Sequence, residues 1–323
     1  MRAACDEHFD LGLHRRRTRR WGASAFLVLT ALWADLCLAQ QAAAPATPQA
    51  APSTPGQGIP PGAIPQPGQR RVQAKTPEES AAYQAFIEAT RPEDRIRLVE
   101  DFLLQYPETE LKESAFQTAM QAYQLKNDYQ HLLTYGELTL AQNQDNLTAL
   151  LTLAATISER TQRTDSDRDE KLNEGDQYAL RALEVIGKLR KPPGFPDERW
   201  LEFRHQTESA AHASRGLIAL IREDFVKAEL ELKEAVALAK EPDAVLLYRL
   251  GLTYSLQRKY AQALEVLERA ASRGGIRIAD ASGKTRDLVE EAREFAAKAL
   301  PPAPPAVPEP PAAASAPLPS PAP

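Results

Sequence analysis

The stretch that decides the fold is residues 244–270, which read AVLLYRLGLTYSLQRKYAQALEVLERA. A related pattern lies about 35 residues earlier, so that a glycine, an aromatic residue, an alanine, a leucine and an alanine return in register. The marks of the later copy are Leu247, Leu250, Gly251, Tyr254, Tyr260, Ala263, Leu267 and Ala270. Those of the earlier copy are Gly216, Ala219, Phe225, Ala228, Leu232 and Ala235. This period predicts stacked helical hairpins, because one hairpin cannot bury its own apolar stripe.

Small residues mark the places where the predicted helices approach most closely. Gly251 and Ala263 lie on the two helices of one hairpin, where a larger side chain would push the helix axes apart. We assign six residues to packing within the repeats: Gly216, Ala228, Gly251, Tyr254, Ala263 and Ala270.

This spacing resembles the tetratricopeptide repeat (TPR). The resemblance implies helix pairs wound into a superhelix whose concave face holds a peptide or a partner helix. It implies a binding function and does not identify the partner. The segment 102–107, FLLQYP, is similar to repeats of periplasmic TPR proteins that serve outer-membrane assembly and cell-envelope coordination. That likeness covers only residues 76–135.

Proline divides the chain into parts. Of 26 prolines, 8 lie in residues 40–75 and 11 in residues 301–323, which leaves 7 for residues 76–300. The two flanks are rich in Ala, Pro and Gln or Gly and cannot bury enough apolar surface to offset their ordering entropy. We therefore predict one folded domain over residues 76–300, a disordered linker over 40–75 and a disordered tail over 301–323.

The N-terminus predicts export. Five arginines between positions 15 and 20 precede an apolar run over residues 21–34, which is short for a membrane span. Residues 1–39 are expected to be a signal peptide cleaved before Gln40, and an uncleaved inner-membrane anchor facing the periplasm is the alternative. The expected location is the periplasm or cell envelope, and membrane contact is expected only through this segment if it stays uncleaved. The position of the true start codon is left open.

Charge and cysteine content exclude some classes of partner and site. The chain carries a formal charge of −5 and residues 1–39 carry +2, so the remainder carries about −7. This disfavours a nucleic-acid partner. Cys5 and Cys37 both lie in the expected leader, so the mature chain would hold no disulfide and no cysteine-based metal site.

Helix-start signals place the remaining elements. Capping boxes at 76–79 and 90–93 predict two helices of a first, atypical hairpin. Further units are expected over 113–144 and from 146 onward, followed by an unusually long helix from Asp197 to about Arg222. A last amphipathic helix over 287–300 is expected to cap the stack. The predicted fold is an all-α, TPR-like solenoid of four to five hairpins with that capping helix.

No pattern of catalytic or cofactor-binding residues stands out. The acidic stretch 165–176 has the spacing of a calcium loop, but Glu170 replaces its turn glycine and Asp176 its bidentate glutamate. Gly283, Lys284 and Thr285 lack the leading glycine of a phosphate loop. We expect no catalysis, no metal and no cofactor.

The predicted working surface is the concave groove. In the TPR family the first helix of each repeat lines that face, and the corresponding positions here are Gln117, Gln121, Gln124, Leu151, Ser158, Leu217, Ile221, Tyr248, Leu252 and Ser255. The row contains no Lys or Arg clamp for a terminal carboxylate, which favours a mixed polar and apolar partner surface. For the leucines, packing between neighbouring first helices is an equal alternative.

The sequence thus predicts a non-catalytic protein-interaction scaffold of the bacterial cell envelope that binds a peptide or helix in a groove. The alternative is a structural role, in which the solenoid self-associates and the proline-rich arms act as spacers. Partner identity and oligomeric state are not fixed by the sequence.

Overall fold

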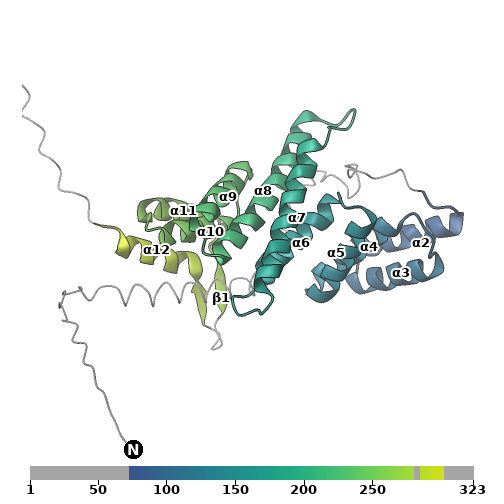
Figure 1. Cartoon of the computed structure of the whole chain (residues 1–323), viewed down its shortest axis with the longest axis horizontal. Coiled ribbons are helices and arrows are strands. Elements are labelled where there is room, and N and C mark those ends of the chain that lie inside the picture. The colour runs from purple at the N-terminus through teal and green to yellow at the C-terminus, as the bar shows by residue number, and fades with distance from the viewer. Residues whose placement is uncertain (1–72, 280–283, 302–323) are drawn as a thin grey trace, which may run out of the picture.

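The chain folds as a row of helical hairpins. The computed structural model describes residues 73–279 and 284–301, and these form eleven helices and two short strands. The hairpins follow one another along the long axis of the molecule (Figure 1). The all-α solenoid predicted from the repeat is confirmed, with five hairpins and a final helix.

Successive helices pair in the order of the sequence. The first three hairpins are α2 (Pro77–Glu88) with α3 (Pro92–Gln105), α4 (Lys112–Leu125) with α5 (Tyr129–Gln142), and α6 (Leu147–Arg160) with α7 (Arg168–Lys188). The last two are α8 (Asp197–Ile221) with α9 (Phe225–Leu238) and α10 (Ala244–Leu256) with α11 (Tyr260–Ser272). The chain then forms β1 (Arg277–Ala279), β2 (Thr285–Asp287) and α12 (Leu288–Ala299).

Side-chain caps explain where several helices begin. The Thr76 side chain accepts a hydrogen bond from the Glu79 N–H, and Pro77 opens α2, as the first capping box predicts. The second box is displaced by one residue. Because Pro92 fixes the first helical position of α3, the cap position falls on Arg91, whose side chain makes no capping bond.

Three hairpins share the same turn between their helices. Asn127, Glu223 and Arg258 adopt left-handed backbone conformations with φ of 56°, 62° and 61°. The N–H of the next residue then returns to the first helix, as in the 2.9 Å bond from Lys259 N to Tyr254 O. This is the helix-ending motif in which glycine is usual, yet none of the three residues is glycine.

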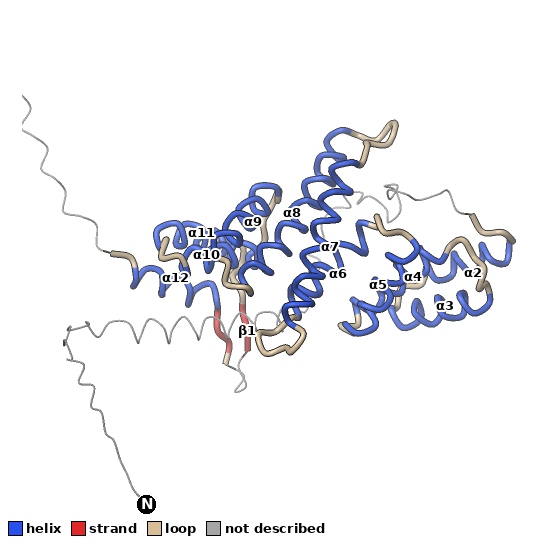
Figure 2. Tube along the Cα trace, viewed as in Figure 1, coloured by secondary structure: helices blue, strands red, loops and turns tan. Residues whose placement is uncertain are grey.

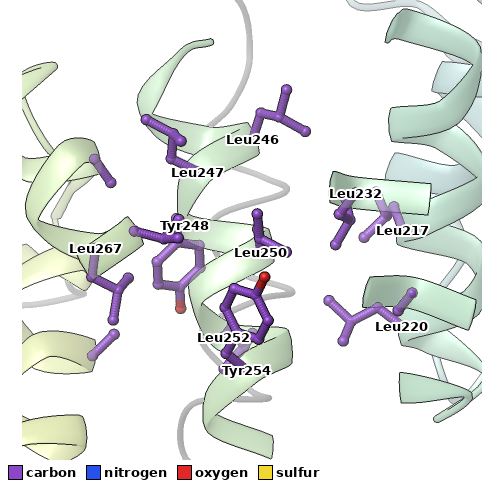
Figure 3. Packing of buried hydrophobic residues seen from close by; sticks show 14 of the residues in the cluster. Leu217, Leu220, Leu232, Leu246, Leu247, Tyr248, Leu250, Leu252, Tyr254 and Leu267 are labelled. Atoms are coloured by element: carbon purple, nitrogen blue, oxygen red, sulfur yellow. The ribbon is translucent and has the colours of Figure 1, made fainter. Parts of the chain in front are cut away.

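The buried apolar side chains form three clusters along the hairpins, and the C-terminal cluster is tight at the repeat glycines. A Cβ built on Gly216 would lie 2.6 Å from Leu232 Cγ, and one on Gly251 would lie 2.6 Å from Leu267 Cγ. The other residues assigned to repeat packing are also buried: Ala228, Tyr254, Ala263 and Ala270. Figure 3 shows this C-terminal core, with the side chains of α10 between those of α11 and those of α8 and α9.

The two longest helices are α7, which ends the third hairpin, and α8, which begins the fourth. α7 has 21 residues and α8 has 25, whereas α9 has 14. At about 1.5 Å per residue, α8 is roughly 16 Å longer than α9. The loop that joins α7 to α8 therefore stands clear of the rest of the solenoid (Figures 1 and 2). The long helix predicted from Asp197 is present.

The C-terminal end contains one feature that the sequence analysis missed. β1 and β2 form an antiparallel pair in which Ile278 lies opposite Arg286. α12 follows directly, capped by the Asp287 side chain, which accepts hydrogen bonds from Val289 N and Glu290 N. α12 packs on α11 and α10, as expected of a capping helix. Gly283 lies outside the described residues.

The whole predicted leader and most of the predicted linker and tail also lie outside the described residues, so the domain boundaries stay a prediction. Across 73–279 and 284–301, every helix is too short or too polar to cross a membrane.

Candidate binding groove between α6, α8 and α10

A groove of about 680 Å³ lies on the described part of the chain and is here called the α6–α8–α10 groove. It crosses the first helices of three successive hairpins and the loop between α9 and α10. Its walls come from Glu159, Glu202, Gln206, Ser209, Ala210, Ala213, Ala239, Lys240, Glu241, Pro242, Asp243, Val245, Leu246 and Arg249. The alanines leave the space open, because their side chains reach only one carbon from the backbone.

Two contacts hold the helices that form the walls. Gly175 of α7 is buried where a Cβ would lie 3.0 Å from Ile157 Cγ2 and 3.3 Å from Ile218 Cδ1, so α6, α7 and α8 converge there. The Ser209 hydroxyl donates a 2.8 Å hydrogen bond to the Ala235 carbonyl, which links α8 to α9. The helices of the groove are therefore packed against their neighbours, and the loop of residues 239–243 completes its walls.

An ion pair joins the two ends of the groove. Arg249 Nη2 of α10 lies 3.3 Å from Glu159 Oε1 of α6. The arginine side chain is 10% exposed and the glutamate 38% exposed. The pair neutralises a mostly buried arginine, as a buried charge requires.

Further charges stand at the rim. Lys240 Nζ lies 3.2 Å from Glu202 Oε1, and the lysine side chain is 75% exposed. Glu241 Oε2 lies 3.2 Å from Arg273 Nη1. The Asp243 carboxylate caps α10 by accepting a 2.7 Å hydrogen bond from Leu246 N. The lining holds four carboxylates against two cations, so the groove is on balance acidic while each of these carboxylates has a partner inside the protein.

A second, smaller hollow continues the groove along α8. It measures about 300 Å³ and shares Glu202, Gln206, Ala239 and Lys240 with the first. Leu201 adds an apolar side chain that is 52% exposed. Together the two hollows form a path along α8 toward the long hairpin, with apolar and charged positions side by side.

Another hollow, of about 370 Å³, lies between α5, α6 and α7. The Arg160 guanidinium stands 3.5 Å from the centre of the Tyr129 ring, a cation–π contact. Burial and the nearby Glu174 carboxylate raise the pKa of Glu137. Among the described residues, no three histidine, cysteine or acidic side chains are grouped so that they could hold a metal ion.

Four of the predicted groove residues are not fully buried, and none of them lies in the walls of the α6–α8–α10 groove. They are Gln117, Gln121 and Gln124 of α4 and Leu151 of α6. Gln117 accepts a 2.8 Å hydrogen bond from Asn146 Nδ2, and Asn146 caps α6 through its own side chain. Gln121 is half-buried, Gln124 is exposed and Leu151 is half-buried.

The other six predicted groove residues are in the core. For Leu217 and Leu252 this agrees with the packing alternative, and for the other four it corrects the sequence analysis. Leu217, Ile221, Tyr248, Leu252, Ser158 and Ser255 are all buried, with Tyr248 at 1% exposure. Tyr248 and Leu252 belong to the same apolar cluster as Ile278 of β1 and Leu288 of α12. The C-terminal strands and helix thus complete a core in which both residues are covered. Ser158 and Ser255 turn their hydroxyls to carbonyls of their own helices, Ala155 O and Gly251 O.

Sequence reasoning also missed the basic residues of the groove. Arg249 and Lys240 line the α6–α8–α10 groove, and neither belongs to the row of positions predicted from the sequence. A signal was present: Arg249 is the one charged residue of α10, a helix that is otherwise apolar or neutral. A charge kept in such a helix indicates a partner nearby in space.

No protein-family model matches the chain, and no curated protein matches it. A thermophilic TPR protein of Thermus thermophilus is 18% identical, with 68% of this chain and 98% of that chain covered and a TM-score of 0.38. A tetratricopeptide repeat protein of Parabacteroides merdae is 12% identical, with 67% and 96% covered and a TM-score of 0.29.

The packing of the hairpins, rather than these two likenesses, carries the description of the chain as a TPR-like solenoid. Gly216 and Gly251 each contact the leucine 16 positions later on the second helix of their hairpin. The turns after α8 and α10 each have a residue in the left-handed conformation at the equivalent position, Glu223 and Arg258. Two consecutive hairpins therefore repeat one structural unit.

Proposed function

We propose that this chain is a non-catalytic protein-interaction scaffold of the bacterial cell envelope that binds a peptide or a helix in the α6–α8–α10 groove. The observation that carries the proposal is the groove itself. It runs across three successive first helices and combines the surface of exposed Ala210 and half-buried Ala213 and Ala239 with charges at its rim. A mixed surface of this kind suits a segment of protein better than a small apolar ligand.

The rim charges support exchange with a partner. The exposed Lys240–Glu202 pair contributes little to folding stability, because exposed ion pairs are screened by water. A partner carboxylate or cation that replaces one member therefore loses little on binding. The envelope location rests on the arginine-rich, apolar pattern of residues 1–39.

The test is crosslinking in the native cell from one position in the groove. A photo-crosslinking residue at Gln206 should capture a partner, and Ala210→Trp in the same chain should abolish that capture by filling the groove. Both side chains are exposed, so folding should be unaffected. The matched control moves the probe or the tryptophan to Ala297, an exposed alanine in the last turn of α12.

Equal capture from the two positions, or capture that survives Ala210→Trp, would contradict the proposal. Light scattering over a range of concentrations addresses the structural alternative. A concentration-dependent oligomer together with crosslinks only to the chain itself would favour a self-associating spacer.

A further inference from the structure

The tip of the long α7–α8 hairpin combines three features outside the groove. It stands clear of the solenoid (Figure 1). It carries aromatic and apolar side chains at its surface, and its cations outnumber its anions. We propose that this tip, defined as residues 187–201, contacts the surface of a membrane that contains anionic lipids. The proposal does not depend on the partner of the α6–α8–α10 groove, although Leu201 of the tip also lines the second, smaller hollow.

The apolar part of the tip is a row of aromatic rings next to an exposed leucine. The Phe195 and Trp200 ring centres are 6.3 Å apart and the rings are nearly perpendicular. Phe203, two residues beyond the tip, has its ring centre 5.6 Å from that of Trp200. All three rings are half-buried. Leu201 is 52% exposed. Tryptophan with an apolar neighbour at a protein surface suits the membrane interface, where one side of the ring meets lipid and the other meets water.

The charge of the tip is opposite to that of the molecule. Lys188, Arg190, Lys191 and Arg199 stand against Asp197 and Glu198, a net charge of +2 in a chain whose net charge is −5. The Lys188 side chain is 78% exposed, and Lys191 pairs with Asp197. Arg190 and Arg199 are exposed and form no ion pair with any residue that the structure describes. Such cations gain free energy near an anionic lipid surface.

The shape of the tip favours a membrane over a protein partner. A stable protein interface takes about 20 to 30 residues from each side. The tip offers one loop and two helix ends, 15 residues in all, and the groove begins only where α8 reaches α9 and α10. A flat bilayer surface can be engaged by one projecting loop, because a few aromatic and basic side chains suffice for a reversible contact.

Trp200 makes the proposal directly measurable. The chain has three tryptophans, and the other two, Trp21 and Trp33, lie near the N-terminus. A full-length Trp21→Phe, Trp33→Phe variant leaves Trp200 as the one reporter. Vesicles of phosphatidylcholine and phosphatidylglycerol in equal parts should shift its emission to shorter wavelength, and lipids brominated on their acyl chains should quench it. Vesicles of phosphatidylcholine alone should produce a much smaller effect.

Charge removal at the tip supplies the specificity test. Arg190→Gln with Lys191→Gln, made in the same background, should weaken binding to the anionic vesicles. The lipid concentration that gives half of the maximal Trp200 signal should rise about fivefold for each charge removed. The matched control is Arg91→Gln with Arg97→Gln, two exposed arginines at α3 whose side chains are 73% and 63% exposed. That pair should leave the signal unchanged, and circular dichroism checks that all variants remain helical.

Three outcomes would overturn the proposal. The first is an unmoved Trp200 emission when the protein sediments with anionic vesicles, which would assign membrane binding to the N-terminal segment. The second is an equal loss of signal in the control pair, which would indicate a non-specific charge effect. The third is an emission shift caused by a cell extract free of lipid and not by vesicles, which would indicate a protein partner at the tip.

Discussion

Gly251 of α10 and Leu267 of α11 approach so closely that a Cβ on the glycine would lie 2.6 Å from Leu267 Cγ. The contacted atom is the branch point of a fully buried leucine, so it cannot rotate away. We expect Gly251→Ala to force the two helices apart and to lower the free energy of unfolding by about 1 to 3 kcal/mol. Urea denaturation measures the change.

Gly187 is the matched control for this prediction. It also lies in a helix, α7, but nothing stands within 4 Å of the position of an added Cβ. Gly187→Ala should therefore raise stability by up to about 1 kcal/mol, the difference in helix propensity. If both substitutions shifted stability in the same direction, close packing would not be the reason for Gly251.

Arg258 offers a stabilising substitution. Its φ of 61° lies in the left-handed region, which costs a side-chain-bearing residue about 1 kcal/mol. Arg258→Gly should relieve this cost and raise the free energy of unfolding, by less than about 1 kcal/mol because glycine also gains entropy in the unfolded chain. A melting curve against wild type measures the gain. Arg258→Ala keeps the Cβ and should bring no such gain, so an equal gain in both variants would argue against the turn as its source.

Tyr248 should act through stability and not through a binding site. Its side chain is buried in the C-terminal core, at 1% exposure (Figure 3). Tyr248→Ala should lower the free energy of unfolding by about 3 kcal/mol or more, as expected for the loss of a buried ring. Tyr248→Phe, which keeps the ring, should lose much less. Unchanged thermal melting of Tyr248→Ala would place the residue outside the core.

We expect the protein to lose stability in acid through the Glu79 carboxylate. The hydrogen bond from the Thr109 hydroxyl, at 2.6 Å, and that from the Lys75 backbone N–H hold the pKa of Glu79 below its ordinary value of 4.5. Because the pKa is lower in the folded state than in the unfolded state, this contribution is present above about pH 4.5. It is lost as the pH falls through the folded-state pKa.

Glu79→Gln tests this prediction. Urea titrations at successive pH values should show a shallower acid loss in the variant than in wild type, because the titrating group is gone. The neighbouring Glu78→Gln, at an exposed position of the same helix, is the control. An acid slope in Glu79→Gln equal to that of wild type would show that other carboxylates determine it.

The local sequence pattern was enough to predict the hairpins but not the residues of the groove. Gly251, Ala263 and Leu267 pack as the repeat predicts because their contacts lie within one hairpin, where sequence spacing fixes distance. Tyr248 was misplaced because its surroundings depend on β1 and α12, which follow later in the chain and lack the repeat.

Gly136 shows the same limit. It lies inside α5, where glycine lowers helix stability, and nothing in the neighbouring sequence explains its presence. In the structure a Cβ there would lie 2.6 Å from Leu153 Cδ2, because α5 and α6 of neighbouring hairpins approach closely. Contacts between hairpins, unlike those within one, are not encoded in a local spacing.

The Arg249–Glu159 pair has a consequence for the order of folding. The two residues are 90 positions apart, and each hairpin between them must be docked before the guanidinium can reach the carboxylate. Contacts of such long sequence separation form late, after the local hairpins. Disruption of the pair should therefore accelerate unfolding and leave the refolding rate almost unchanged. The groove that the pair spans comes into being only when the central and C-terminal hairpins have joined, so a partner that binds there selects completely assembled molecules.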